Sequence, residues 1–286
     1  MKIGFIGAGK VGSTLGKFFS EGGVPVTGYY SRHRESAQAA AQFTDTEIFH
    51  SISSLVAQSD VIFVTVPDRE ITRVFQSIQT CDLAGKQICH CSGAMTGTEA
   101  FPGAEAAGAA AYSIHPLFPI SSKTTAYREL EGVFFCLEGP EPGLSNWCDL
   151  LSKLGCRTFT IQSEDKVKYH TACSIASNLV CGLLQESLEL MEQCGMDDTT
   201  ALEALRPLIL ANVNHVLQEG PEQALTGPVE RNDTKTVSRH LSAFSHPEDQ
   251  QMYCAVSRKL VELAERKHPD EEYSMMKTIL EEGLES

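Results

Sequence analysis

MKIGFIGAGKVG, at residues 1–12, is the stretch that decides the fold of this chain. A short apolar run, residues 3–6, leads directly into Gly7, Gly9 and Gly12, which have the spacing G-x-G-x-x-G. The residues that follow, STLGKFFSEGG, predict a helix that ends at the glycine pair. A strand, a glycine-rich turn and a helix in this order are typical of a dinucleotide-binding site.

The three glycines have different physical purposes in such a site. Gly7 provides the conformation of the turn, Gly9 lets a pyrophosphate approach the backbone, and Gly12 lets the helix pack closely on the strand. The helix N-terminus then offers unpaired N–H groups to the phosphates. The residues that we expect to bind the cofactor here are Gly7, Ala8, Gly9, Lys10, Val11 and Gly12. The alternative is a glycine-rich turn that binds nothing.

The end of the second predicted strand, VPVTGYY at 24–30, indicates which dinucleotide binds. An enzyme that uses NAD usually has Asp or Glu there, to hold the ribose 2′-hydroxyl. This chain has Ser31 and Arg32 instead, and no carboxylate before Glu35. A hydroxyl and a guanidinium group suit a 2′-phosphate, so we favour NADP over NAD. The alternative is that Arg32 and Arg34 are solvated residues at the start of the next helix.

The composition limits the partners and the compartment. The 286 residues carry a net charge of −14, which argues against nucleic acids and anionic membranes. No run of about 18 apolar residues is available to span a membrane, and Lys2 precedes a strand rather than a signal peptide. We therefore expect a cytoplasmic protein whose ten cysteines are reduced and mostly buried. We expect no metal site, because His90 and the adjacent Cys89 and Cys91 point to opposite faces of a strand.

Strands and helices alternate through the first half of the chain, which predicts a doubly wound Rossmann domain over residues 1–162. VIFVTVP at 61–67 is a nearly continuous β-branched run, as expected for a parallel strand that is buried on both faces. Ligands of open α/β sheets lie at the carboxyl ends of the strands. Val66, Pro67 and, after the next strand, Ser92 are therefore expected to border the cofactor.

The pattern becomes entirely helical after that, which predicts an all-helical second domain over residues 163–286. One long helix is expected from Glu164 to about Cys194, and its middle, residues 172–184, is apolar or small nearly all round. Such a helix is buried in a bundle or against a second subunit. We expect a homodimer built on this domain.

Several motifs spread over the chain resemble those of one known family. They are GAGKVG (7–12), CSGA (91–94), HPLFP (115–119), KVKYH (166–170), SN (177–178), TGP (226–228) and RNDT (231–234). The chain resembles the family that joins an N-terminal Rossmann-like domain to a C-terminal domain of unknown function numbered 2520. The match spans nearly the whole chain.

The resemblance implies a two-domain architecture similar to that of ketopantoate reductases, pyrroline-carboxylate reductases and hydroxyacid dehydrogenases. In those enzymes a helical domain closes over the nicotinamide and supplies a catalytic Lys and Asn. For some members of the present family it implies an alternative ketopantoate (2-dehydropantoate) 2-reductase in pantothenate biosynthesis, while other members have no assigned substrate. Hydroxyacid dehydrogenases place the Lys and Asn four positions apart, a spacing that Lys166 and Asn178 do not have.

Reduction of a ketone requires a proton donor for the forming alkoxide and a group that holds any substrate carboxylate. Lys166 and His170 stand at i and i+4 near the start of the long helix, so they share one face. Either can be the donor, and Lys168 points elsewhere. Asn178 lies further along the same helix and completes the predicted catalytic set with His115.

Substrate contacts are expected from His115, Ser92, Gly93 and Arg231. The first three end strands and so face the ligand crevice. Arg231 can clamp a carboxylate, or Asp233 can neutralise it within a structural turn, and both outcomes stay open for the segment 226–233.

Three functions compete. The leading one is an NADP-dependent oxidoreductase acting on the C=O group of a small, anionic 2-oxo acid, with ketopantoate the best single guess. The second is an imine reductase of the pyrroline-carboxylate type, although the Ser-Gly-Pro-rich signature of that family is missing. The third is an NADP(H)-binding sensor without turnover, which has no need of a titratable pair such as Lys166 and His170.

Overall fold

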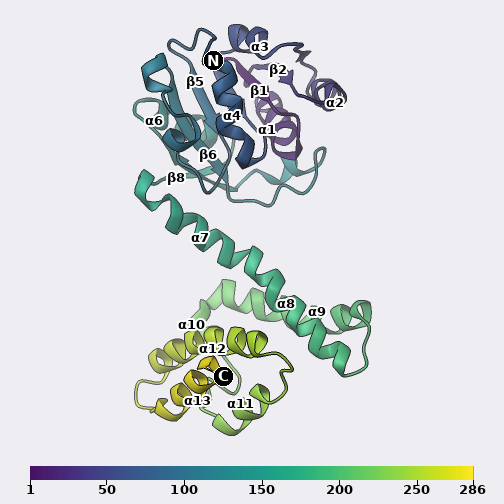
Figure 1. Ribbon diagram of the computed structural model, residues 1–286, viewed down its shortest axis with the longest axis vertical. Coiled ribbons are helices and arrows are strands. Elements are labelled where there is room, and N and C mark those ends of the chain that lie inside the picture. Colours follow the sequence, from purple (N-terminus) through teal and green to yellow (C-terminus); the bar gives the residue numbers. More distant parts are fainter. Residues whose placement is uncertain (286) are drawn as a thin grey trace. The chain divides into compact units, whose positions relative to one another are not determined.

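The computed structural model describes residues 1–285, which divide into two compact units (Figure 1). The first unit is Met1–Ala176 and the second begins at Ser177. Each unit has buried apolar clusters of its own, two in the first and one in the second.

Eight strands of the first unit form one sheet with the order β3-β2-β1-β4-β5-β6-β7-β8. The strands are β1 (Ile3–Ile6), β2 (Val26–Tyr30), β3 (Glu47–Ile48), β4 (Val61–Val64), β5 (Gln87–His90), β6 (Ala110–Pro116), β7 (Phe134–Glu138) and β8 (Arg157–Thr160). All neighbours are parallel except β6 and β7. The reversal of order between β1 and β4 gives the switch point at which doubly wound sheets bind ligands.

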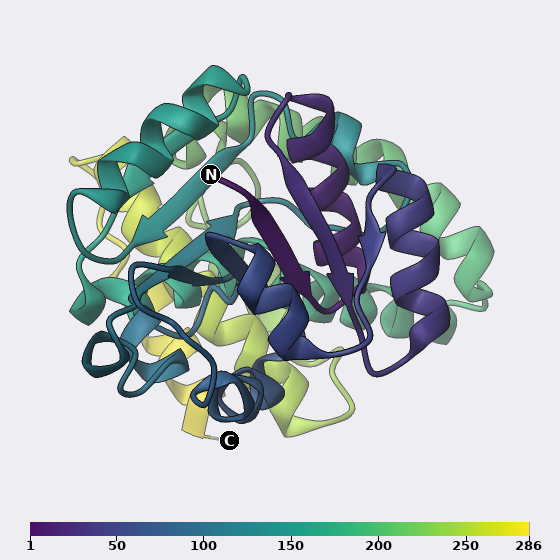
Figure 2. The same ribbon diagram turned by 90° about the horizontal axis from the view of Figure 1, so that it is seen from above.

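Helices cover both faces of this sheet. They are α1 (Lys10–Glu21), α2 (Arg34–Thr44), α3 (Ile52–Gln58), α4 (Asp68–Ile78), α5 (Gly97–Ala100) and α6 (Gly143–Lys153). The last helix of the unit, α7 (Lys166–Ala176), contributes no residue to the buried clusters of the sheet. One buried cluster joins α1, α2 and α6 to the sheet, and the other joins α3, α4 and α5 to the opposite face. In Figure 2, β1 and β2, in purple, run side by side between helices. The predicted doubly wound Rossmann fold is confirmed.

The centre of the sheet shows why its strands are so apolar. Val61 and Phe63 of β4 pack in one cluster, and Ile62 and Val64 pack in the other. None of the four is more than 1% exposed. A parallel strand with helices on both faces has no side that faces solvent. The side chains that point to either face of the sheet are therefore apolar.

The second unit is helical, as predicted, and has the elements α8 (Asn178–Gln193), α9 (Asp198–Glu219), α10 (Pro221–Ala224), α11 (Thr234–Leu241), α12 (Pro247–Lys267) and α13 (Ser274–Glu285). Among the described residues, no helix is both long enough and apolar enough to cross a bilayer.

The single long helix predicted from Glu164 to Cys194 is wrong. A 3-10 turn, η3 (Ser163–Asp165), precedes α7, and the helix is interrupted at Ser177, whose φ of −126° and ψ of −72° are not helical. Serine is a poor residue for a helix interior, but the residues on both sides of Ser177 are helical. The interruption coincides with the division between the two units.

The cysteines are unpaired, and their burial differs from the expectation. Cys89 and Cys136 are buried under the helices of the first unit, but Cys181 of α8 and Cys194, which follows that helix, are exposed. The apolar character of α8 therefore does not place all of its side chains in a core.

Candidate functional site

The turn after β1 has the geometry that the three glycines predict. Gly7 has a φ of +112°, in the region that L-residues rarely adopt, and a Cβ there would lie 2.6 Å from the carbonyl oxygen of Thr65. The Gly7 amide donates to the carbonyl of Tyr30 at 2.8 Å. The hydroxyl of Thr65 donates to the Gly7 carbonyl at 2.9 Å. The turn is thus fixed by β2 and β4 on its two sides.

The start of α1 leaves backbone donors available for an anion. A Cβ on Gly12 would lie 2.4 Å from the Gly7 carbonyl oxygen, so this glycine allows the helix to pack on the turn. A Cβ on Gly9 would meet nothing within 4 Å, so the space beside it is open. The first helical hydrogen bond runs from the Ser13 amide to the Gly9 carbonyl at 3.0 Å. The N–H groups of residues 10–12 come before this bond, so they have no partner within the helix and are available at its N-terminus.

A cleft of about 460 Å³ opens beside this turn. The predicted cofactor residues that line it are Gly7, Ala8, Gly9, Ser31, Arg32, Val66 and Pro67. Lys10, Val11 and Gly12 form the first turn of α1, immediately after Gly9. Ser92 does not line this cleft. Its carbonyl instead accepts a hydrogen bond from the hydroxyl of Ser113.

Sequence analysis missed three charged residues of this cleft, Glu70, Arg73 and Lys123. Arg32 and Arg73 each place an Nη1 atom near the same oxygen of Glu70, Oε2, at 3.7 and 3.8 Å. Positions three and four apart along α4 share a face, so counting from Pro67 along α4 could have found Glu70 and Arg73. Lys123 lies in an irregular loop after β6, where no periodicity exists to find it.

Lys166 begins α7 and is buried, with only 1% of its surface exposed. Its Nζ donates to the hydroxyl of Ser113, in β6, at 2.6 Å. That hydroxyl in turn donates to the carbonyl of Ser92 at 3.2 Å. Burial lowers the pKa of Lys166, and the nearby Cys136 and Glu138 partly oppose this effect. An amine held in this way loses its proton more readily than a solvated lysine.

His115, His170 and Gly93 come together beside this lysine. A Cβ on Gly93 would lie 2.6 Å from Cδ2 of His170 and 3.0 Å from Nε2 of His115. The other ring nitrogen of His115, Nδ1, hydrogen bonds to the hydroxyl of Tyr169. Burial, together with the nearby charges of Lys166 and His170, lowers the pKa of His115 to about 4. His115 is therefore neutral near pH 7 and has one donor and one acceptor nitrogen.

Ser92 has its polar groups engaged within the protein. Its hydroxyl donates to Asp68 at 2.6 Å and accepts from the amides of Ala94 and Met95 at 3.1 and 3.3 Å. Its own amide donates to Nδ1 of His90 at 3.1 Å. These bonds hold the turn that presents Gly93, so Ser92 positions the turn, and its contact with a ligand stays a prediction.

His90 is fully buried in β5, and its Nε2 lies 3.2 Å from the carbonyl of Thr96. Burial lowers the pKa of His90 to about 3, so the ring is neutral and its two nitrogens serve the backbone. Within residues 1–285, no group of three or more His, Cys, Asp or Glu side chains could hold a metal ion.

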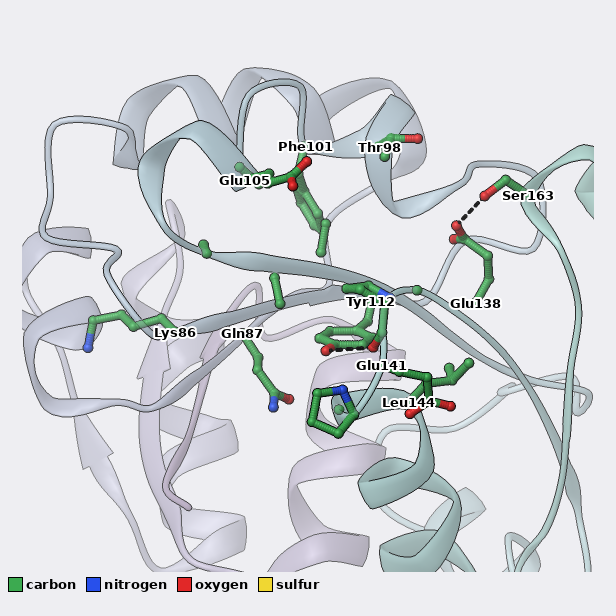
Figure 3. A pocket seen from close by; sticks show the side chains of 18 of the residues that line it. Lys86, Gln87, Thr98, Phe101, Glu105, Tyr112, Glu138, Glu141, Leu144 and Ser163 are labelled. Atoms are coloured by element: carbon green, nitrogen blue, oxygen red, sulfur yellow. Dashed lines mark hydrogen bonds between the residues drawn. The ribbon is translucent and has the colours of Figure 1, made fainter.

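A larger pocket, of about 950 Å³, opens at the starts of β5 and β6, at the opposite ends of these strands from Gly93 and His115 (Figure 3). It shares no lining residue with the cleft beside the glycine-rich turn. Glu138, only 4% exposed, accepts from the Ser163 hydroxyl and from the Gly97 amide, both at 2.7 Å. These two bonds tie η3 and α5 to the sheet, so Glu138 has a structural role at this pocket.

Asn178 and Arg231 belong to the second unit, and both are exposed. Asn178 is the first residue of α8. Asp233 caps α11, accepting from the amide of Thr236 at 3.0 Å. Its hydrogen bonds with Thr236 lower its pKa, and the charge of Arg231 adds to this effect. The side chain of Asn232 donates to the carbonyl of Glu272 at 2.9 Å. Part of the segment 226–233 is therefore structural, while ligand binding by Arg231 stays a prediction.

Two family comparisons agree with this architecture. A Rossmann-like domain matches residues 1–116, and "Domain of unknown function (DUF2520)" matches residues 133–260. The fold and the glycine-rich turn define a Rossmann-like protein of the dinucleotide-binding class. The chain belongs to the family that joins a Rossmann-like domain to a DUF2520 domain.

Solved structures with the same fold include two from bacteria. Protein TM1727 from Thermotoga maritima is 28% identical, with a TM-score of 0.72 over 93% of this chain and 99% of that one. A proposed NADP oxidoreductase from Bacteroides fragilis, BF3122, is 22% identical, with a TM-score of 0.72 over 91% and 98%. A reductive aminase from Aspergillus terreus, in complex with NADPH and ethyl-5-oxohexanoate, is 16% identical, with a TM-score of 0.61 over 99% and 93%. No curated protein matches the chain.

Proposed function

We propose that this protein is an NADP-dependent oxidoreductase that reduces the carbonyl group of a small 2-oxo acid. One observation carries the proposal: a buried Lys166 joins His115, His170 and Gly93 in the same unit as a glycine-rich dinucleotide turn. Gly93 follows β5, and His115 lies at the end of β6. Both strands belong to the same sheet as β1, which leads into the glycine-rich turn. The similarity to BF3122 and to the reductive aminase that binds NADPH supports the class of reaction and the cofactor.

The chain's own residues supply the proton and the electrostatics of this reaction. When NADPH is bound, it supplies a hydride to the carbonyl carbon. Lys166 in its ammonium form transfers a proton to the oxygen, and its charge stabilises the alkoxide as it forms. The neutral ring of His115 orients the carbonyl by a hydrogen bond, and His170 is the alternative donor. Binding of a substrate carboxylate by Arg231 and a catalytic role for Asn178 stay predictions from the sequence.

Ketopantoate is the substrate that the family resemblance favours, in the pathway to pantothenate. The test is a panel of 2-oxo acids that includes ketopantoate, with the loss of nicotinamide absorbance as the measurement. We expect turnover with NADPH and a kcat/KM at least about tenfold lower with NADH, because Ser31 and Arg32 replace the acidic ribose ligand. A panel in which NADH works as well as NADPH contradicts the assignment of the cofactor.

An imine reductase is the second candidate, and the structural similarity to a reductive aminase and to an imine reductase from Myxococcus stipitatus favours it. The latter, a variant in complex with NAD+, is 18% identical, with a TM-score of 0.63 and 98% of both chains covered. Cyclic imines in the same panel separate the two reactions. Tight NADPH binding without turnover of any 2-oxo acid or cyclic imine favours an NADP(H)-binding sensor instead.

We also propose a homodimer built on the helical unit, in a protein of the cytoplasm. Large apolar side chains are exposed along α8 and α9, among them Leu179, Leu208 and Leu217, which are 58%, 67% and 77% exposed. Water contact with so many leucines is unfavourable, and a second subunit removes it. We expect twice the mass of one chain by light scattering at micromolar protein. The mass of a single chain would contradict the dimer.

A further inference from the structure

We infer that Arg73 binds the 2′-phosphate of the cofactor together with Arg32, and that Glu70 is the anion that limits how strongly the pair prefers that phosphate. The inference rests on the proposed use of NADP. It places part of the cofactor specificity on α4, rather than on the end of β2 alone.

The three side chains converge on one position in the cleft beside the glycine-rich turn. Arg32 follows β2, whereas Glu70 and Arg73 lie one turn apart on α4, and all three line the cleft. Two guanidinium groups from different elements lie within 3.8 Å of one oxygen of Glu70. Lys123 lines the same cleft and adds a third cation. In a chain with a net charge of −14, this local excess of positive charge marks an anion position.

The ion pairs with Glu70 are easily exchanged for a phosphate. The side chains of Arg32 and Arg73 are 69% and 79% exposed, and their distances to Glu70 exceed those of direct hydrogen bonds. Exposed pairs of this kind contribute little stability. A phosphate monoester carries a charge of about −1.5 to −2 and three acceptor oxygens, and arginine pairs with it through two parallel hydrogen bonds. The phosphate is therefore the better partner for both arginines.

The floor of the cleft suits the base that accompanies this phosphate. Ile52, Val66 and Val74 line it beside the charged residues. An adenine ring buries its faces against such aliphatic side chains, and the planar guanidinium of Arg32 can stack on an aromatic ring. The cleft thus matches an adenosine that carries a 2′-phosphate.

Glu70 opposes the phosphate after it binds. Its carboxylate stays on the same turn of α4 as Arg73 and repels the second negative charge. A cofactor without the 2′-phosphate has no charge at this position and experiences less of the repulsion. Glu70 therefore reduces the difference in binding affinity between NADPH and NADH.

The experiment is calorimetry on the full-length protein with adenosine 2′,5′-bisphosphate and with 5′-AMP as probes. We expect Arg73→Ala to weaken the bisphosphate by at least about fivefold and 5′-AMP by less than about twofold. Glu70→Gln is expected to strengthen the bisphosphate by about threefold and to leave 5′-AMP within about twofold. The effect of Arg73→Ala should shrink at high salt, because the phosphate contact is screened.

Arg69→Ala is the matched control. Arg69 also lies near Glu70, at 3.9 Å, and on the same helix, but it does not line the cleft. It is expected to change both affinities by less than about twofold. Arg73→Ala that weakens both probes equally, or no more than Arg69→Ala does, overturns the inference. Wild-type protein that binds 5′-AMP as tightly as the bisphosphate overturns the use of NADP itself, and with it the inference.

Discussion

Replacement of Lys166 by methionine is expected to lower kcat by about a hundredfold or more, while the affinity for NADPH stays within a few-fold. Methionine fills the space of the lysine stem and removes only the amine. The Lys166 side chain is buried and its Nζ is bonded to Ser113, away from the cleft beside the glycine-rich turn. Loss of the amine therefore removes the proposed proton donor without touching the cofactor. Stopped-flow measurement of single turnovers on an accepted substrate gives the rate of the chemical step.

The pH dependence gives this experiment a second readout. Burial lowers the pKa of Lys166 from its usual 10.5. The amine is a proton donor only below its pKa, so kcat should fall as the pH rises through a value lower than that of a solvated lysine. The methionine variant should lose this fall. A wild-type profile without any loss of kcat up to the usual pKa of lysine contradicts Lys166 as the donor.

Lys168→Met is the matched control, because Lys168 stands on the same helix and its side chain is 82% exposed. It pairs with Asp165 and is expected to keep normal turnover. If Lys166→Met retains most of its turnover and His170→Ala loses it, the proton comes from His170. If neither variant changes kcat on any accepted substrate, the catalytic role of α7 is wrong.

The fold could be predicted because its signals are local. The apolar run before Gly7, the glycine spacing and the β-branched strand at 61–64 each report burial or conformation of their own residues. The grouping of Gly93 and His115 could also be anticipated, because β5 and β6 are parallel and their ends meet at one edge of the sheet. The place of His170 depends on the path of α7 after the antiparallel step from β6 to β7, which no local signal gives. The same reasoning did not reveal that the Ser92 hydroxyl is occupied by Asp68, since that bond depends on where α4 begins.

The features that sequence analysis missed depend on dihedral angles and on tertiary distances. Ser177 interrupts a helix although the residues on both sides keep a helical pattern, so periodicity could not detect the break. Lys123 reaches the cleft from a loop. The hydroxyl of Thr14 holds this loop by donating a hydrogen bond to the carbonyl of Ser122 at 3.1 Å. No spacing rule connects residues that far apart in the chain.

Gly9→Val is expected to weaken NADPH binding by about a hundredfold or more without unfolding the protein. Gly9 has a φ of −79° and a ψ of −165°, which is extended backbone that valine adopts readily. A Cβ at this position meets no protein atom within 4 Å, so the new side chain occupies the open space beside the turn. That space is where a pyrophosphate must approach the N–H groups at the start of α1. Calorimetry with NADPH and thermal unfolding of the same sample are the measurements.

Gly12→Ala separates the effect on binding from an effect on folding. Its Cβ would lie 2.4 Å from the Gly7 carbonyl oxygen and 2.5 Å from the Thr65 hydroxyl, so α1 must move away from the turn. We expect this variant to lower Tm by several degrees, whereas Gly9→Val should leave Tm within about two degrees of wild type. The two glycines thus divide the motif into a residue needed for packing and a residue needed for the ligand. A folded Gly9→Val protein with normal affinity for NADPH would mean that the dinucleotide does not bind at this turn.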